Sequence, residues 1–489
     1  MASNEIPSDV EKNDSSVAEE AEGKRVNDVP INTVLASAGS ERQLVRRQDK
    51  RILPLSAAIY FLCYLDRSNI GNARVLNSST RNDMQTETGA SEWQFNIALM
   101  IFLMGYFLFE VPSNIMLKKF RPSRWLALLM LCWGSVTIGL GGTKSPSQLI
   151  GVRFLLGACE AGLFPGLVYY LTFWYKTDER STRVAIILAS ATLAGAFGGA
   201  IAYGVGHMNQ IRGLSGWRWL FILEGTPSCV SALLAWFFLP DYPERASWLT
   251  GPEKELAAQR LYVEGSKGSA SNLTWEDVKT TLTDWRLYFH YLIYFVVSFP
   301  VGSLSLFSPT IVSGLGYHDL DAQLMTIPPW AVAYVCMILV SWSADHFNAR
   351  GYHAAGSAIV GGISFLVAAV LPPESYRGRY GCLIVGTACT FAGVPAMLGW
   401  LTSNLWSTAS IGLAVGINVS CGGAGSMPSV WIYKADEALL GYPTGHAVNC
   451  AMLFLVAISA LGLRYYYGRQ NRVLLSSAAE GIVPRLYKL

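Results

Sequence analysis

Long apolar segments separated by short polar connections dominate this sequence of 489 residues. An apolar run of about 17–25 residues is long enough to cross a bilayer as a helix. We predict twelve such spans, at 53–73, 95–117, 124–142, 148–173, 184–207, 217–239, 287–313, 325–344, 352–371, 380–404, 410–433 and 446–467. The one long polar interruption among them, 240–286, leaves six spans on each side. The pattern therefore predicts an all-α membrane protein with twelve transmembrane helices in two six-helix halves.

The polar segments complete a division of the chain into five parts. We expect a disordered cytoplasmic N-terminal tail (1–51), an N-terminal six-helix bundle (52–239), a cytoplasmic central loop (240–286), a C-terminal six-helix bundle (287–467) and a cytoplasmic C-terminal tail (468–489). No apolar signal segment precedes Ile52, so the first span acts as its own insertion signal. Basic residues in the short loops favour the side of the N-terminus, which predicts that both termini are cytoplasmic.

That orientation places the triplet Asn77-Ser78-Ser79 in the first outer loop. An Asn-x-Ser triplet in an outer loop is a glycosylation acceptor. We therefore predict that Asn77 is glycosylated, with an unused triplet as the alternative.

Composition supports the membrane interpretation and excludes other classes. Charged residues make up 15% of the chain, against about 25% in soluble proteins, which is too few to cover a soluble surface of this size. A net charge of +3 argues against a nucleic-acid partner. The nine cysteines lie in apolar stretches without a Cys-x-x-Cys pair, so neither a disulfide framework nor a metal site is expected. Motifs of hydrolases, zinc proteases and nucleotide-binding enzymes are absent from the sequence, which argues against an enzyme.

Ionisable residues inside the predicted spans are the first functional candidates, because charge is costly in a bilayer. At the helical rise per residue, Asp66 lies roughly 18 Å from the start of its span, and Glu160 lies roughly 16 Å from the start of the fourth span. Both positions are near the middle of the bilayer, as is Arg67. Arg153 and Glu160 are seven residues apart and share a helix face, whereas the adjacent Asp66 and Arg67 point about 100° apart.

These four residues suit one chemistry. A carboxylate beside an arginine, or in an apolar site, is a plausible proton carrier when the arginine binds an anion. We therefore predict Arg67 and Arg153 as substrate-binding residues and Asp66 and Glu160 as proton-coupling residues. The alternative is a structural ion-pair network that joins the first and fourth helices.

Other polar residues in the spans receive lesser roles. Glu110 lies beside a proline in the second span and Glu224 in the sixth, and we interpret both as gating or structural residues. Asp345, at the end of the eighth span, is interpreted as an acid of a gating loop. In the less charged C-terminal half, Ser305 and Asn404 are predicted to line the other wall of a substrate cavity, with ordinary packing as the alternative.

Several strings of the sequence resemble one known family when they are taken together. They are Tyr64-Leu65-Asp66-Arg67-Ser68-Asn69, Phe109-Glu110-Val111-Pro112-Ser113-Asn114, Gly151-Val152-Arg153-Phe154, Glu160-Ala161-Gly162-Leu163-Phe164-Pro165-Gly166, the run from Trp217 to Gly225, and Phe237-Phe238-Leu239-Pro240-Asp241-Tyr242-Pro243. The combination resembles the anion:cation symporter family of the major facilitator superfamily, in its fungal allantoate-permease-like branch. The resemblance runs from about residue 50 to 467 and is stronger in the first half.

The resemblance implies proton-coupled uptake of a small organic anion across the plasma membrane by alternating access. It implies that Arg67 holds the substrate carboxylate, that Asp66 and Glu160 are protonated, and that Arg153 modulates Glu160. The expected partners are the organic anion and the lipid bilayer; the chain is expected to be a monomer, with no cofactor besides the coupling proton. Members of the family carry a basic Gly-His-Thr-Lys-Arg stretch after the tenth helix, and the segment that follows Asn404 lacks it.

Two other functions remain open from the sequence. Efflux antiporters of this superfamily usually carry a glycine-proline motif in the fifth helix. Residues 193–199 supply the glycines without the proline, which disfavours export of a drug or secondary metabolite. The altered segment after Asn404 leaves a non-transporting sensor as the other alternative.

Overall fold

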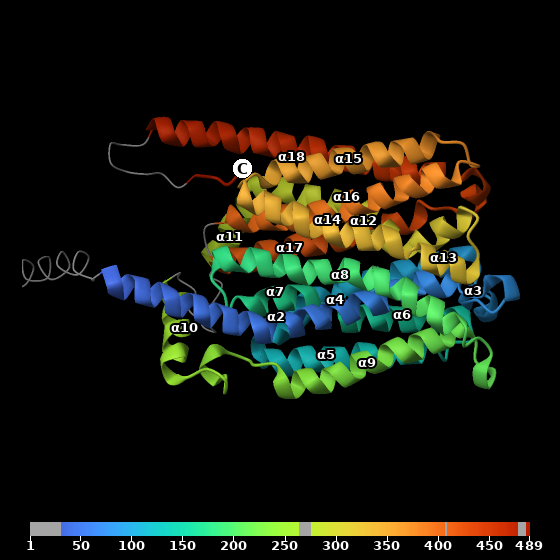
Figure 1. The fold of residues 1–489 in the computed structure, drawn as a ribbon, viewed down its shortest axis with the longest axis horizontal. Helices are drawn as coiled ribbons and strands as arrows, with labels where there is room; N and C mark the ends of the chain where they lie inside the picture. The colour runs from blue at the N-terminus through green and yellow to red at the C-terminus, as the bar shows by residue number, and fades with distance from the viewer. Residues whose placement is uncertain (1–30, 264–274, 406–407, 478–485) are drawn as a thin grey trace, which may run out of the picture. The chain divides into compact units, whose positions relative to one another are not determined.

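The computed structural model describes residues 31–263, 275–405, 408–477 and 486–489 (Figure 1). The chain divides into two compact units, residues 1–51 and residues 52–489. Helix α2 (Ile31–Val75) includes all the described residues of the first unit. Helix α2 therefore covers residues 31–51 of the tail for which the sequence predicts disorder, and the Glu, Arg, Gln and Leu residues there favour a helix. Residues 1–30 lie outside the described part.

Helices form the whole regular structure of the described residues in the second unit, with no strand among them. The N-terminal half contains the end of α2, then α4 (Glu92–Lys119), α5 (Pro122–Leu140), α6 (Pro146–Glu160), α7 (Leu163–Leu171), α8 (Thr177–Gly206) and α9 (Gly216–Phe238). The C-terminal half contains α12 (Trp285–Gly314), α13 (Asp319–Met325), α14 (Ile327–His346), α15 (Arg350–Val370), α16 (Tyr376–Ser403), α17 (Thr408–Ser426) and α18 (Pro443–Ser477).

Short helices occupy the connections between these elements. They are η1 (Ser78–Thr80), α3 (Met84–Thr88), η2 (Ile211–Gly213), η3 (Pro243–Arg245), α10 (Gly251–Val263), α11 (Trp275–Thr283), η5 (Pro428–Trp431) and η6 (Ala435–Leu440). The central segment 240–286, which the sequence predicts as the loop between the halves, carries η3, α10 and α11. Likewise, α18 continues ten residues beyond the end of the predicted twelfth span, to Ser477.

Ten segments of the described chain are helical, long and apolar enough to cross a membrane, with α6–α7 and α13–α14 each counted as one span. The other two predicted spans correspond to α2 and α17. Asp66, Arg67 and Asn69 make the relevant part of α2 more polar than the other spans. The predicted all-α fold with two six-helix halves is confirmed, and the fourth span differs from the prediction in being broken between α6 and α7.

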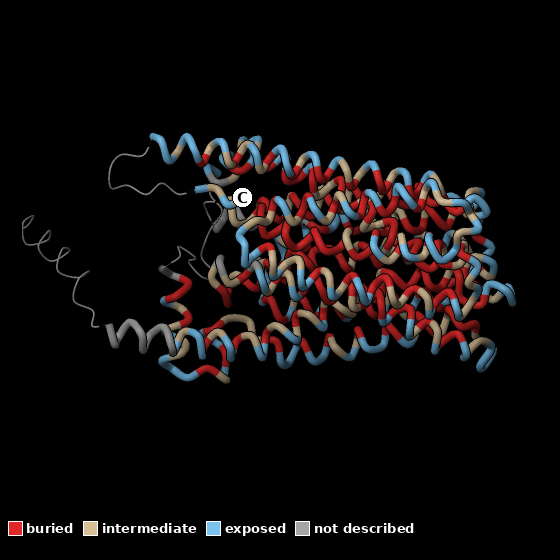
Figure 2. The backbone as a smooth tube through the Cα atoms, turned by 45° about the horizontal axis from the view of Figure 1, so that its top comes forward, coloured by how far each residue is buried: buried red, intermediate tan, exposed pale blue. Residues whose placement is uncertain are grey.

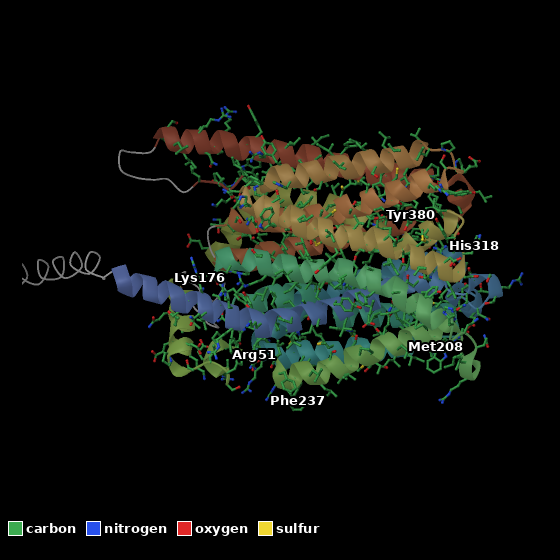
Figure 3. The ribbon with its side chains drawn as sticks, in the orientation of Figure 1. Arg51, Lys176, Met208, Phe237, His318 and Tyr380 are labelled. Atoms are coloured by element: carbon green, nitrogen blue, oxygen red, sulfur yellow. The ribbon has the colours of Figure 1, made fainter. Side chains whose placement is uncertain are left out.

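The helices of the second unit run between two ends of the bundle. Lys176 and Phe237 mark one end, and Met208, His318 and Tyr380 mark the other (Figure 3). We call them the Lys176 end and the His318 end. Helices α8, α12 and α17 begin at the Lys176 end, whereas α4, α9 and α16 finish there.

Burial follows the pattern expected for a bundle surrounded by lipid. Buried residues lie in the interior of the bundle, while exposed residues lie on its outside (Figure 2). Large apolar side chains are among the exposed residues, including Phe237, Val370 and Ile458. An apolar outer surface is stable in a bilayer because the lipid chains around it are apolar. The spans are helical because helices satisfy their backbone hydrogen bonds internally there.

Candidate functional site

An ion pair joins the first and fourth membrane spans near their middle. The Arg67 Nε donates to Glu160 Oε2 at 3.3 Å. The Glu160 side chain is fully buried, whereas 24% of the Arg67 side chain is exposed. The Cys63 thiol donates weakly to the same Glu160 oxygen, and Oε1 has no partner among the described residues. The guanidinium of this pair is therefore partly accessible, while the carboxylate is buried.

The fourth span is interrupted directly after this carboxylate. Helix α6 ends at Glu160, Ala161 adopts a non-helical ψ of 135°, and Gly162 has a φ of 80° before α7 begins. A side chain at Gly162 would also meet Ser113 of α4, whose Cβ lies 2.6 Å from the position of an added Cβ. Glycine is required here for both reasons. Because α6 ends at Glu160, this carboxylate lies beside the last carbonyl groups of the helix, which have no hydrogen-bond partner within it.

A second guanidinium lies close to the same cluster. Arg153 is fully buried on α6, and none of its three side-chain nitrogens has a hydrogen-bond partner among the described residues. Its guanidinium carbon lies 4.5 Å from the centre of the Phe102 ring. The guanidinium of Arg67 lies 5.3 Å from the same ring and 4.6 Å from that of Tyr106. Two arginines thus share one aromatic residue, and of the two only Arg67 is paired with a carboxylate among the described residues.

Asp66 points away from Arg67, in the direction that helix geometry predicts. Its Oδ2 accepts hydrogen bonds from Ser228 Oγ at 2.6 Å and from Trp133 Nε1 at 3.2 Å, so it faces α5 and α9 within its own half. Glu224 lies one turn before Ser228, is 2% exposed, and has no partner for either carboxylate oxygen in the described structure. The two acidic residues lie in the N-terminal half, and neither contacts a basic side chain of the described residues directly.

The C-terminal half approaches the Arg67 pair through Ser305 of α12. The Ser305 hydroxyl is hydrogen-bonded to the Tyr64 hydroxyl. The ring of Tyr64 also lies 6.4 Å from that of Trp330, which in turn contacts Phe391 at 4.8 Å. Hydroxyl and aromatic groups of both halves therefore meet within one turn of Arg67. Ser305 therefore contacts the N-terminal half, and its place in the wall of a substrate cavity stays a prediction.

Glu110 connects the two halves by another contact. It is 1% exposed, and its Oε2 accepts a hydrogen bond at 3.1 Å from Ser420 of α17. Its other oxygen is without a partner among the described residues. Glu110 therefore lies between the halves, and its gating or structural role stays a prediction.

Further hydrogen bonds join the halves at the His318 end. Asp319 of α13 accepts hydrogen bonds from Ser78 Oγ at 3.2 Å and from Ser79 N at 3.0 Å. Gln323 donates to the carbonyl of Asn72 at 3.2 Å, and Glu92 accepts from the backbone N–H of Ala435 at 3.1 Å. The described contacts thus close the bundle at the His318 end.

Two of the predicted site residues lie away from this centre, at the Lys176 end. Asp345 pairs with Arg350 at 2.8 Å at the Lys176 end of the bundle. Asn404 caps α16 at that same end, and its side chain bonds to the backbone of Trp400 and Lys488. The prediction that Asn404 lines the substrate cavity is therefore wrong in this structure, because its hydrogen-bonding groups are used at the helix end.

The predicted glycosylation residue lies at the His318 end. Asn77 is 9% exposed, and its amide nitrogen donates to the carbonyl of Gly206 at 3.3 Å. Glycosylation of Asn77 remains a prediction, and this geometry argues against it because the nitrogen that would carry the sugar is buried and bonded.

A cavity of about 300 Å³ lies between the halves at the His318 end. Its lining comes from α2, η1, α3, α12, η6 and the residue that precedes α18: Arg74, Val75, Ser78, Gln85, Thr310, Ser313, Gly314, Ala438 and Tyr442. Arg74 is the one charged residue of the lining, and it is paired with Glu92 at 3.4 Å. Elsewhere, the described residues contain no cluster of His, Cys, Asp or Glu side chains that could hold a metal ion.

Sequence reasoning missed the neighbours that give the charged residues their environment. Ser228 is recognisable only as a hydroxyl one turn from Glu224, and nothing in the sequence singles out Trp133 among 15 tryptophans. The same holds for Phe102, Tyr64 and Ser420, because their roles depend on which helices are adjacent.

Comparison with known proteins identifies the class to which this arrangement belongs. Residues 57–430 match the Major Facilitator Superfamily, so the chain belongs to this superfamily of transporters, which are not enzymes. It is a multi-pass membrane protein. Its fold resembles that of the xylose transporter XylE from E. coli in a partially occluded inward-open conformation, with a TM-score of 0.61, 14% identity, and coverage of 84% of this chain and 97% of XylE.

Individual relatives are more similar in sequence. The chain is 63% identical over 455 residues to the MFS transporter prlL of Fungal sp. (strain NRRL 50135), with 92% of each chain covered. It is 33% identical over 330 residues to a putative tartrate transporter of Agrobacterium vitis, with 67% of this chain and 71% of the relative covered.

Proposed function

We propose that this transporter carries a small organic anion together with protons by alternating access. The observation that carries the proposal is the Arg67–Glu160 pair, in which a partly exposed guanidinium is held by a fully buried carboxylate. Arg153 adds a second positive charge beside the same Phe102 ring, without a hydrogen-bond partner among the described residues. An anion that enters the site meets an excess positive charge in surroundings of low dielectric constant, where electrostatic attraction is strong.

The geometry couples anion binding to protonation. A substrate carboxylate that binds Arg67 competes with Glu160 for the same guanidinium. When Glu160 loses this partner, its buried negative charge is no longer compensated, and uptake of a proton becomes favourable. Anion binding and protonation of Glu160 therefore promote each other, as linkage requires. The transporter would then change between its outward-open and inward-open states with the substrate and the proton bound together.

Asp66 provides a second place for a proton. It lies on the same helix as Arg67, and its carboxylate bonds to α5 and α9, so its protonation would loosen contacts within the N-terminal half. Arg67, Arg153 and Ser305 are thus the proposed substrate-binding residues, and Asp66 and Glu160 the proposed proton-coupling residues. No cofactor besides the proton is required by this scheme.

The finer assignment follows the sequence resemblance to the anion:cation symporter family and its allantoate-permease-like branch. A relative named as a putative tartrate transporter supports an organic anion as substrate. With the basic loops on the cytoplasmic side, the Lys176 end is cytoplasmic, and the closed His318 end faces outward. We place the protein in the plasma membrane as a monomer, with both termini in the cytoplasm.

Uptake by purified protein in proteoliposomes tests this function. A panel of radiolabelled small carboxylates is offered with an inward proton gradient, with the gradient reversed, and with a proton uncoupler. The proposal expects uptake of at least one carboxylate that is driven by the inward gradient and is reduced by the uncoupler. Uptake driven by the reversed gradient would instead establish export by proton antiport, and uptake that is indifferent to both would contradict coupling.

A further inference from the structure

A short extended segment, Leu486–Leu489, docks on the C-terminal half at the Lys176 end. Two asparagines bind the backbone N–H and C=O groups of two successive residues in it. Asn404 Nδ2 donates to the Lys488 carbonyl at 3.1 Å, and Asn404 Oδ1 accepts from the Lys488 N–H at 2.8 Å. Asn471 makes the same pair of bonds to Tyr487, each at 2.8 Å. Each amide side chain thus satisfies both polar groups of one backbone residue.

The Tyr487 side chain is the anchor of the segment. Its ring stacks on that of Tyr467 at 5.0 Å with an angle of 11° between the planes. The guanidinium of Arg286 lies 5.1 Å from the Tyr487 ring and bonds to its hydroxyl. Arg286 is itself held by Asp284, which precedes α12. A tyrosine fits this position in both of its parts, because the ring meets an aromatic face and the hydroxyl meets a cation.

The contacts come from three helices. Arg286 is the second residue of α12, Trp400 lies in the last turn of α16 and Asn404 caps that helix, and Tyr467 and Asn471 belong to α18. Trp400 Nε1 donates to the Lys488 carbonyl at 2.9 Å, and the Trp400 ring contacts Tyr467 and His290. Segment Leu486–Leu489 therefore ties the end of α16 to α12 and α18. The contacts to Lys488 are made with its backbone, and its side chain is exposed.

We propose that these helix ends form a peptide-docking site that recognises an extended segment through a tyrosine and two backbone clamps. The chain fills this site with its own residues 486–489. Occupancy fixes the last turn of α16, so that α12, α16 and α18 move as one block. A transporter whose halves rock against each other needs that rigidity within each half. The docking itself is independent of which substrate is carried.

Hydrogen exchange in lipid nanodiscs tests the docking directly. In Tyr487→Ala and Asn471→Ala, exchange of the amides at the end of α16 (residues 399–404) should rise about tenfold, because the segment no longer protects that turn. Lys488→Ala is the matched control, since it removes an exposed side chain and keeps both backbone clamps. Equal exchange in the wild type and in Tyr487→Ala would refute the proposal.

A peptide added in trans tests recognition separately from folding. The variant that lacks residues 486–489 should show the same raised exchange, and millimolar acetyl-Leu-Tyr-Lys-Leu should lower it again, because tethered segments have effective concentrations in that range. The peptide with alanine in place of tyrosine should leave the exchange raised. Equal protection by both peptides, or by neither, would overturn the recognition of tyrosine at this site.

Discussion

At the scale of single residues, the placement of charge inside the N-terminal half defines the centre of this transporter. Arg67 is the accessible partner in the ion pair with Glu160, and Arg153 is a buried cation that depends on Phe102 for contact. A buried charge without a hydrogen-bond partner is costly and is retained where it serves a function. The same environment explains why the substitutions below are expected to affect transport rather than insertion.

Arg67→Ala should abolish uptake. Removal of the arginine that pairs with the substrate carboxylate costs about 2–5 kcal/mol of binding free energy. This corresponds to a loss of about 30-fold or more in affinity for the substrate. Initial uptake rates over a range of substrate concentrations measure the effect. Arg81→Ala, at an exposed arginine of the first connection, is the control and should transport normally. Normal uptake by Arg67→Ala would remove the proposed carboxylate anchor.

Glu160→Gln should separate transport from the proton gradient. The amide keeps the size of the side chain but cannot take up a proton, so an anion can still bind Arg67 while the coupling site is lost. Counterflow exchange of substrate should persist, and accumulation driven by an inward proton gradient should disappear. An unchanged gradient dependence would show that Glu160 is structural.

The sequence contained much of the candidate site at this scale. Charges within apolar runs single out Asp66, Arg67, Arg153 and Glu160, and helix geometry correctly separates Asp66 from Arg67. Asn404 shows the limit of this reasoning. A polar residue at the end of an apolar run fits a cavity wall and a helix cap equally well, and only the position of Lys488 distinguishes them.

At the scale of the element, the break in the fourth span is the main departure from prediction. Apolar length alone predicts one helix over 148–173, and the structure instead ends α6 at Glu160. Gly162 and its left-handed backbone make the break, and the neighbouring α4 approaches through Ser113. Discontinuous helices of this kind form binding sites in many transporters, because their ends expose backbone groups.

Gly162→Ala should destabilise the protein. A non-glycine residue in the left-handed region costs about 1–3 kcal/mol, and the new Cβ would collide with Ser113. Thermal unfolding in detergent measures the loss of stability. Gly151→Ala is the matched control on α6, because an added Cβ there meets no atom within 4 Å, and it should leave the melting temperature unchanged or slightly higher. Similar melting temperatures for both variants would argue against a strained break.

At the scale of the whole transmembrane unit, the close approach of α8 to α13 and α14 holds the halves together at the His318 end. An added Cβ at Gly199 would lie 2.7 Å from the carbonyl oxygen of Gln323, and Gly195 directly faces Trp330. Small residues of this kind let helix backbones approach closely in a membrane. The seam must separate if the opposite conformation is to form, so its packing sets the balance between the two states.

Gly199→Val should shift the protein away from this conformation. The larger side chain cannot fit against α13, so the closed seam loses stability relative to the open one. Hydrogen exchange of α13 (Asp319–Met325) should become faster. Gly204→Val lies on the same helix at a position where an added Cβ meets nothing within 4 Å, and it should exchange like the wild type. Protection of α13 that is equal in all three proteins would exclude this role of the seam.

The sequence by itself determined the all-α membrane class, the two halves and the charged residues of the centre. It did so because both helix length and the cost of buried charge are properties of local composition in a bilayer. Only the tertiary structure decided which partners those charges meet, where α6 ends, and that residues 486–489 dock on α12, α16 and α18. These features depend on contacts between residues far apart in the chain, and such contacts leave no local pattern in the sequence.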